Sequence, residues 1–214
     1  MAQSADPAPR RIGRPPRLSR ERIVEVAAEM DPANLTLTAV ADRLGAARNA
    51  VAYHVGSRED LLALAIERRL AARLADLSVP LDDWRAAVRI ATHGMLDALL
   101  QEGPAALAVT RAPLPGVIGP SEDLLTALTR AGFSAHDAGR TLGMLAELVY
   151  AAARNSLDSG AASTTASALD QVVASAADRY PTFAEALSER WEPREQLDFS
   201  LDVVILGLER VLDR

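Results

Sequence analysis

The sequence predicts an all-α protein, and three observations lead to this fold class. Apolar residues recur every three or four positions along most of the 214 residues, which is the period of an amphipathic helix. No stretch alternates apolar and polar residues as a half-buried strand does, and no Asn-Gly pair marks a hairpin. Glycine and proline interrupt the periodic stretches where loops are expected. We therefore expect helices joined by loops.

The composition excludes several classes of protein. The chain has no cysteine, which excludes disulfides and thiolate metal sites. Nowhere do about 18 apolar residues follow one another without a charge, so no membrane span is expected. The opening residues lack the apolar core of a signal peptide. We expect a cytoplasmic protein.

Positive charge is concentrated near the N-terminus, although the whole chain has a net charge of −6. Residues 1–75 carry 12 arginines and 9 acidic residues (net +3), whereas residues 76–214 carry 11 arginines and 20 acidic residues (net −9). Only the N-terminal part therefore suits a nucleic-acid partner. Residues 1–18 hold four prolines and few apolar residues, which predicts a disordered arm. Its arginines are Arg10, Arg11, Arg14 and Arg17.

Four helices are expected between residues 19 and 76. Ser19 is a good N-cap for the first helix, and Asp31-Pro32 ends it. Its predicted apolar face consists of Ile23, Val24, Ala27, Ala28 and Met30. Thr36 caps a short second helix that Gly45 stops. A third short helix covers about residues 47–54, and Gly56-Ser57 separates it from a long fourth helix over about residues 59–76.

The second and third of these helices have the plan of a DNA-binding helix-turn-helix. The tight turn between them needs a residue that tolerates positive φ, and Gly45 supplies it. The third helix presents Arg48, Asn49, Ala52 and Tyr53 early in its length, where a recognition helix meets the major groove. We predict that residues 19–62 form a three-helix DNA-binding domain.

Residues 63–214 are predicted to form a larger helical domain. Two late helices have apolar stripes. One stripe consists of Ala138, Leu142, Leu145, Ala146, Val149, Ala152 and Ala153, and the other of Leu197, Leu201, Val204, Ile205, Leu208, Val211 and Leu212. The periodicity fits two arrangements equally well: a four-helix bundle with a second copy of the chain, or packing inside one core.

Residues 19–70 resemble the DNA-binding domain of the TetR family of bacterial regulators. The resemblance depends on Leu35-Thr36, Val40-Ala41 and Leu44-Gly45, and above all on residues 50–62, Ala-Val-Ala-Tyr-His-Val-Gly-Ser-Arg-Glu-Asp-Leu-Leu. The tail from Tyr180-Pro181 to Arg210 is similar, more loosely, to the tetracycline-repressor branch. Ala47 departs from the usual Ser or Thr cap of the recognition helix, and Ala52 replaces a usual aromatic residue.

The resemblance implies roles in binding a palindromic operator in double-stranded DNA. Thr36, Tyr53, His54 and Arg58 would contact phosphates. Thr38, Arg48 and Asn49 would face base edges, and Ala52 a thymine methyl group. The segment from Ile12 to Pro15, with Arg14, is similar to half of a minor-groove hook. Without the resemblance, these residues fit a solvated surface, a packed hinge at His54 and an arm that touches no groove.

The resemblance also implies a homodimer whose larger domain binds a small molecule. Ligand binding would shift the fourth helix and change the spacing of the two recognition helices. Candidate ligand-binding residues, each equally compatible with a core or surface role, are Trp84, His93, Met95, Met144, Glu147, Tyr150 and Asn155. Val109 and Leu74 stand where the tetracycline repressor has histidines, so tetracycline is not the expected ligand. No metal or cofactor is expected.

Two other functions are alternatives to that of a transcriptional repressor. Three scattered histidines, no cysteine and no glycine-rich phosphate loop leave little from which to build an enzyme site. A protein–protein adaptor that kept the fold and lost DNA binding is the remaining alternative, and Ala47 and Ala52 are compatible with it.

Overall fold

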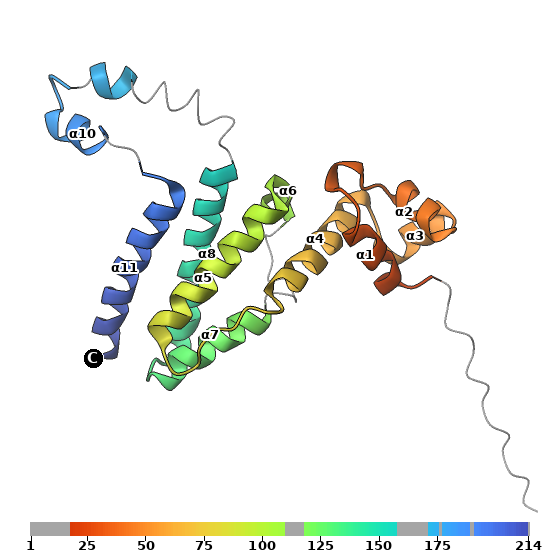
Figure 1. The fold of residues 1–214 in the computed structure, drawn as a ribbon, viewed down its shortest axis with the longest axis horizontal. Coiled ribbons are helices and arrows are strands. Elements are labelled where there is room, and N and C mark those ends of the chain that lie inside the picture. The colour runs from red at the N-terminus through yellow and green to blue at the C-terminus, as the bar shows by residue number, and fades with distance from the viewer. Residues whose placement is uncertain (1–17, 110–117, 158–170, 176, 189–190, 214) are drawn as a thin grey trace, which may run out of the picture. The chain divides into compact units, whose positions relative to one another are not determined.

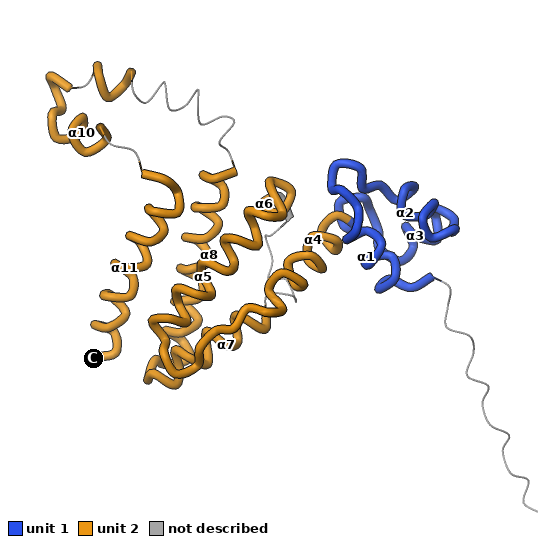
Figure 2. Tube along the Cα trace, in the orientation of Figure 1, with its two compact units in different colours: residues 1–61 blue, residues 62–214 orange. Residues whose placement is uncertain are grey.

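The computed structural model describes residues 18–109, 118–157, 171–175, 177–188 and 191–213. The chain divides into two compact units, residues 1–61 and residues 62–214, which are coloured separately in Figure 2. All the regular elements in the described ranges are helices (Figure 1), so the predicted all-α fold class is confirmed.

The described part of the first unit contains α1 (Arg20–Ala28), α2 (Leu37–Leu44) and α3 (Arg48–Val55), with a short 3-10 helix at Pro32–Asn34. Ser19 caps α1 as expected, because its hydroxyl accepts a hydrogen bond of 3.2 Å from the amide of Arg22. The Asp31 carboxylate accepts from the amide of Ala33 at 2.9 Å and starts the 3-10 helix. Local side-chain caps therefore place the helix starts.

The buried face of α1 differs from the predicted one at three positions. Val26 is buried, whereas Val24 and Ala28, which the sequence pattern placed inward, are only half-buried. Ile23, Val26, Ala27 and Met30 follow the spacing i, i+3, i+4 and i+7, which puts them on one side of a helix. Val24 lies off that stripe, so the prediction was wrong there.

The second unit is a helical bundle. Helix α4 (Arg58–Leu74) begins in the first unit and its greater part lies in the second. It is followed by α5 (Trp84–Glu102), α6 (Pro104–Val109), α7 (Ile118–Arg130), α8 (Ala135–Leu157), α10 (Pro181–Ala186) and α11 (Pro193–Leu212). Helix α5 packs on α7 and α8, and α11 packs on α8. Among the helices of the described ranges, none has the length and apolar character needed to cross a membrane.

The apolar stripes of α8 and α11 are part of the core of this unit. Leu145 and Val149 of α8 are buried in it together with Leu201 and Ile205 of α11. These residues therefore pack within their own chain, and the four-helix bundle with a second copy stays a prediction. Trp84 at the start of α5 is buried in the same core and meets Phe133 edge-on, with ring centroids 5.3 Å apart.

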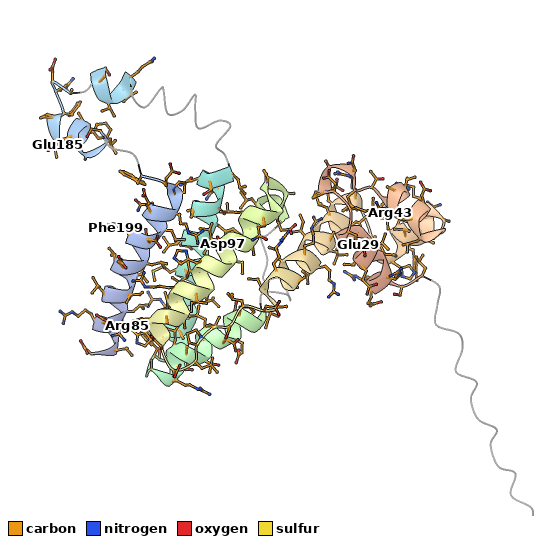
Figure 3. All side chains as sticks on the ribbon, viewed as in Figure 1. Glu29, Arg43, Arg85, Asp97, Glu185 and Phe199 are labelled. Carbon is orange, nitrogen blue, oxygen red and sulfur yellow. The ribbon has the colours of Figure 1, made fainter. Side chains whose placement is uncertain are left out.

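A series of charged pairs, which we call the α5–α11 ladder, joins α5 to α11. It consists of Arg85–Glu209 (2.6 Å), Arg89–Asp202 (2.5 Å), His93–Asp198 (2.9 Å) and Asp97–Arg194 (2.7 Å). The four members on α5 are spaced four residues apart, so they lie along one edge of that helix. Arg85 and Asp97, labelled in Figure 3, mark its two ends on α5. The ladder fixes the direction and register of α11 along α5.

Candidate functional site

The helix-turn-helix of the first unit has the predicted geometry. Thr36 caps α2, because its hydroxyl oxygen accepts a hydrogen bond of 3.0 Å from the amide of Ala39. Gly45 ends α2 in the left-handed conformation, with φ of 60°, and the amide of Ala46 donates to the carbonyl of Ala41 at 2.9 Å. A residue other than glycine would be strained in this turn. The chain then enters α3 at Ala47, whose side chain provides no cap.

The exposed face of α3 is unusual for a surface helix of eight residues. Val51 and Val55 are buried and hold the helix against the rest of the unit. On the opposite side the Tyr53 side chain is 87% exposed, and Arg48 and Asn49 are exposed at the first turn. Ala52 is half-buried between these faces. Tyrosine combines an apolar ring with a hydrogen-bonding hydroxyl and is enriched at interfaces, so this face is suited to a partner.

The start of α2 adds polar groups to the same unit. Thr36 and Thr38 are both exposed. The Thr36 hydroxyl accepts from Ala39, but its own proton is free for donation to a phosphate oxygen. The first amides of a helix also point away from the helix without internal partners and attract anions.

Arg58 has a structural contact as well as an exposed position at the start of α4. Its Nε donates a hydrogen bond of 2.8 Å to the carbonyl oxygen of Leu35, just before α2. This bond ties the start of α4 to the start of α2 within the first unit. No residue pattern predicts this bond, because the acceptor is a backbone atom and no side chain marks its position. A guanidinium has four further N–H groups, which are suited to phosphate.

The turn between α3 and α4 is held by a reciprocal cap. The amide and hydroxyl of Ser57 donate to the Asp60 carboxylate at 2.9 Å and 2.8 Å, and the amide of Asp60 donates back to Ser57 at 3.1 Å. These bonds lower the pKa of Asp60 because they stabilise the charged carboxylate. Gly56 precedes the cap with φ of 84°, and a Cβ there would lie 2.6 Å from an Asp60 oxygen.

His54 is half-buried beside Tyr53, with the two rings edge-on and their centroids 5.5 Å apart. The pKa of Glu21 on α1 is lowered, mainly by hydrogen bonds to the Glu21 carboxylate from its own backbone amide and from Ser19. Arg20 and His54 lower it further by smaller electrostatic contributions. His54 is therefore near an ionised carboxylate of α1. Both the packed-hinge role and the phosphate-contact role are compatible with this position.

The predicted DNA-contacting residues of α2, α3 and the start of α4 thus all belong to one unit. Thr36, Thr38, Arg48, Asn49, Tyr53 and Arg58 are exposed, and Ala52 and His54 are half-buried. Their contacts with DNA stay a prediction. Arg10, Arg11, Arg14 and Arg17 lie outside the described residues.

The seven candidate ligand-binding residues are distributed over different surroundings in the second unit. Trp84 is buried in the core, Met95 and Tyr150 are half-buried against it, and His93 pairs with Asp198. Met144, Glu147 and Asn155 are on the exposed side of α8. An open hollow between the end of α4 and α5, lined by Arg73, Asp76, Asp97 and Gln101 among others, includes none of the seven. Their role in ligand binding stays a prediction.

An exposed apolar face of α11 was missed by the sequence analysis. Phe199 (65% exposed), Val203 (54%) and Leu206 (63%) follow the spacing i, i+4 and i+7 on the side away from the core residues of that helix. We call these three residues the α11 outer face, and Phe199 is labelled in Figure 3. The same spacing was visible in the sequence, but the stronger stripe through Leu201 and Ile205 obscured it.

Comparisons with known proteins agree with this architecture. Residues 79–212 match the family model described as tetracyclin repressor-like, C-terminal domain. None of the curated protein sequences matches the chain. Among solved structures, the TetR family protein ActR of Streptomyces coelicolor in complex with (S)-DNPA is similar over 89% of this chain and 97% of its own, with 22% identity and a TM-score of 0.68.

Two further structures are similar over all or nearly all of their length. The transcriptional regulator SCO7222 of Streptomyces coelicolor, a TetR, has 23% identity and a TM-score of 0.61, with coverage of 92% of this chain and 100% of its own. A TetR variant from Acinetobacter baumannii AYE in complex with minocycline has 22% identity and a TM-score of 0.62, with coverage of 92% and 96%. At these identities the likeness shows a common fold.

Proposed function

Because this chain belongs to the TetR family of transcriptional regulators, we propose that it binds a palindromic operator as a homodimer and is released by a small molecule. Membership of the family makes it a regulator and not an enzyme. We further propose that it acts as a repressor and that it does so in the cytoplasm. Binding to an operator and release by a ligand belong to the same proposal.

The observation that supports DNA binding most directly is the exposed face of α3. The Tyr53 side chain is 87% exposed, so its ring and its hydroxyl are both available to a partner, and tyrosine is enriched at interfaces. Arg48 and Asn49 lie at the N-terminal turn of the same helix, which is the end that a recognition helix presents to base edges. We propose that Arg48 reads guanine and Asn49 reads adenine.

Contacts with phosphates would fix the orientation of α3 in the groove. We assign these contacts to Thr36, Tyr53, His54 and Arg58, and a base-facing position to Thr38 with Ala52 against a thymine methyl group. The starts of α2 and α4 are held by the hydrogen bonds Thr36–Ala39 and Arg58–Leu35, which supports a rigid set of contacts. The arginines of residues 1–18 would add minor-groove contacts.

The α11 outer face supports a homodimer. Its three apolar side chains are more than half exposed in a single chain, and burying them against a second copy would remove them from water. Gly139 and Gly143 on the exposed side of α8 have nothing within 4 Å of a Cβ position, which leaves room for a helix to approach closely. A two-fold axis between such helices gives an isologous interface. The dimer then presents two recognition helices to half-sites about 34–36 Å apart.

Release by a small molecule is supported by the architecture and by what similar proteins bind. ActR has been solved in complex with actinorhodin, and the Acinetobacter TetR variant in complex with minocycline. The larger helical unit of this chain includes residues 79–212, which match the tetracyclin repressor-like C-terminal domain. We propose that ligand binding lowers the affinity of this chain for DNA, and that DNA binding lowers its affinity for the ligand by the same factor.

The test is selection of bound sequences from a random duplex library, followed by fluorescence anisotropy on the best palindrome and on scrambled DNA over a salt series. The expected result is a palindrome bound at least about 10³-fold more tightly than scrambled DNA, with affinity that falls linearly on log–log axes as salt rises. Arg48→Ala and Asn49→Ala should lower this ratio. Arg130→Ala, at the end of α7 in the second unit, is the matched control for loss of an exposed arginine.

The same experiment distinguishes the adaptor alternative. An adaptor would enrich no palindrome, and Arg48→Ala and Arg130→Ala would then be equivalent. That outcome would overturn the proposal of DNA binding even though the fold belongs to the family.

A further inference from the structure

Helix α4 has a special position in the fold because its residues belong to both units. Its first turn, with Arg58 and Leu61, is part of the first unit, where Arg58 is bonded to the carbonyl of Leu35. The rest of the helix, from Leu62 onward, belongs to the second unit. A rigid helix moves as one body, so whatever holds its second half also limits where its first turn can go.

A buried carboxylate holds this second half. Glu102, the last residue of α5, has only 2% of its side chain exposed. One carboxylate oxygen lies 2.7 Å from Nε of Arg69, and the other lies 2.8 Å from Nε of Arg73. Arg69 and Arg73 are four residues apart on α4 and so lie on one side of it. Glu102 therefore contacts two successive turns of α4.

The backbone places Glu102 at the corner between α5 and α6. Gly103 follows it with φ of 75° and ends α5, and α6 begins at Pro104. Gln101 adds a second contact, because Nη1 of Arg73 donates to its side-chain oxygen at 2.5 Å. The last turn of α5 thus ends in two side chains that both face α4.

The Glu102 ion pairs are screened by water much less than the pairs of the α5–α11 ladder. The acidic side chains of the ladder are 36–60% exposed, and such pairs contribute little to stability because water screens them. The side chain of Glu102 is enclosed, and that of Arg69 is only 16% exposed. Removing the charge from a buried pair leaves its partners uncompensated, so they must move to find water. The partners here are both on α4.

We propose that Glu102 is a positioning residue for α4: its bonds to Arg69 and Arg73 hold the helix in the position that DNA binding requires. The inference rests on the proposed DNA-binding function for its effect on affinity, but not for its effect on α4. Without the Glu102 charge, α4 occupies more positions. The fraction of molecules with correctly placed recognition helices then falls, and the apparent affinity falls with it.

The central variant is Glu102→Gln, which keeps the size of the side chain and removes its charge. Arg73→Gln removes the contacts with Glu102 and Gln101 at a side chain that is 36% exposed, and it gives a second route if Glu102→Gln does not fold. The matched control is Glu209→Gln, which removes the Arg85–Glu209 pair between α5 and α11 without touching α4. Hydrogen exchange of α4 amides and operator affinity are measured for the wild type and all three variants.

We expect Glu102→Gln and Arg73→Gln to speed amide exchange within residues 62–74 and to weaken operator binding about three- to tenfold. Glu209→Gln should change neither quantity. Faster exchange spread evenly over the second unit, or unchanged exchange in α4, would overturn the proposal by reducing Glu102 to a general stabilising residue. If the wild type binds no operator, the proposed function fails by itself, and the exchange measurement still decides whether Glu102 holds α4.

Discussion

At the scale of single residues, Tyr53 and Val51 show how one short helix serves two purposes. Val51 is fully buried and fixes α3 to the first unit, whereas Tyr53, two positions later, is almost fully exposed. Substitutions at the two positions should therefore affect different properties. A buried valine contributes to folding, and an exposed tyrosine contributes to what the helix touches.

Tyr53→Ala should weaken operator binding by about 1–2 kcal/mol, roughly tenfold, while stability changes by less than about 0.5 kcal/mol. Anisotropy and thermal unfolding measure the two effects. Tyr53→Phe separates the hydroxyl from the ring, because only the hydroxyl donates to a phosphate. Phe183→Ala, at another exposed aromatic residue, is the control and should leave DNA binding unchanged. A large loss of stability in Tyr53→Ala would contradict this division of roles.

The cap formed by Ser57 and Asp60 predicts a dependence of stability on pH. The pKa of Asp60 is lowered in the folded protein, so its contribution is complete above the unfolded pKa and is lost as pH falls through the folded pKa. Between about pH 5 and pH 2, stability should fall less steeply in Asp60→Asn than in the wild type. Glu59→Gln removes the same charge one residue earlier and is the control. Equal slopes for the wild type and Asp60→Asn in acid unfolding monitored by circular dichroism would refute this.

Residue types alone predicted the caps at Ser19 and Thr36 and the turn at Gly45, because these contacts are local. They could not predict the bond from Arg58 to Leu35, because it joins residues 23 positions apart through a backbone oxygen. The charge partners of Glu102 were equally hidden, since only the packing of α5 against α4 brings them together.

At the scale of helices, the start of α3 lacks a feature that the starts of α1 and α2 have. Ser19 and Thr36 each accept an amide hydrogen bond, whereas Ala47 provides no side-chain oxygen. The backbone at Ala47, with φ of −74° and ψ of 139°, is already in the extended conformation of an N-cap. The position is therefore suitable for a cap that the sequence does not supply.

Ala47→Ser should raise the free energy of unfolding by about 1 kcal/mol, because its hydroxyl can accept one of the free amides of the first turn. Thr36→Ala should lower it by a similar amount at the start of α2. Chemical denaturation of both variants checks this pair of opposite effects. No gain from Ala47→Ser would mean that another group already satisfies those amides.

The extent of each helix followed well from sequence periodicity, but the environment of its faces did not. The fourth helix was expected over about residues 59–76 and is observed at Arg58–Leu74. Periodicity identifies an apolar stripe without naming what covers it, so it left open whether the stripes of α8 and α11 met their own chain. It also gave no reason to single out Phe199, Val203 and Leu206 on the other side of α11.

At the scale of the whole molecule, the α5–α11 ladder and the α11 outer face indicate two separate roles for α11. Leu201 is buried in the core of its own chain and the ladder lies beside it, whereas the outer face is where we propose that a second copy binds. DNA binding by a palindrome-reading protein requires that partner, because one recognition helix reaches only one half-site. Dimer formation and operator binding should therefore fail together.

Leu206→Arg should convert the proposed dimer to a monomer, because a charge on the outer face must be desolvated when two copies meet. Analytical ultracentrifugation measures the change in mass, and anisotropy measures the accompanying loss of operator affinity. Ile118→Arg, at an exposed residue of α7, is the matched control. A Leu206→Arg protein that stays dimeric would show that α11 is not the interface.

The two tryptophans of the sequence differ in their exposure to water and therefore in their expected fluorescence. Trp84 is 6% exposed and packed against Phe133, whereas Trp191 is 51% exposed. Both belong to the second unit, and residues 1–61 contain no tryptophan. A buried indole emits at shorter wavelength than a solvated one, so intrinsic fluorescence separates the interior of the second unit from its surface. The first unit has no tryptophan to contribute to tryptophan emission, so melting of its helix-turn-helix by itself would leave that signal unchanged.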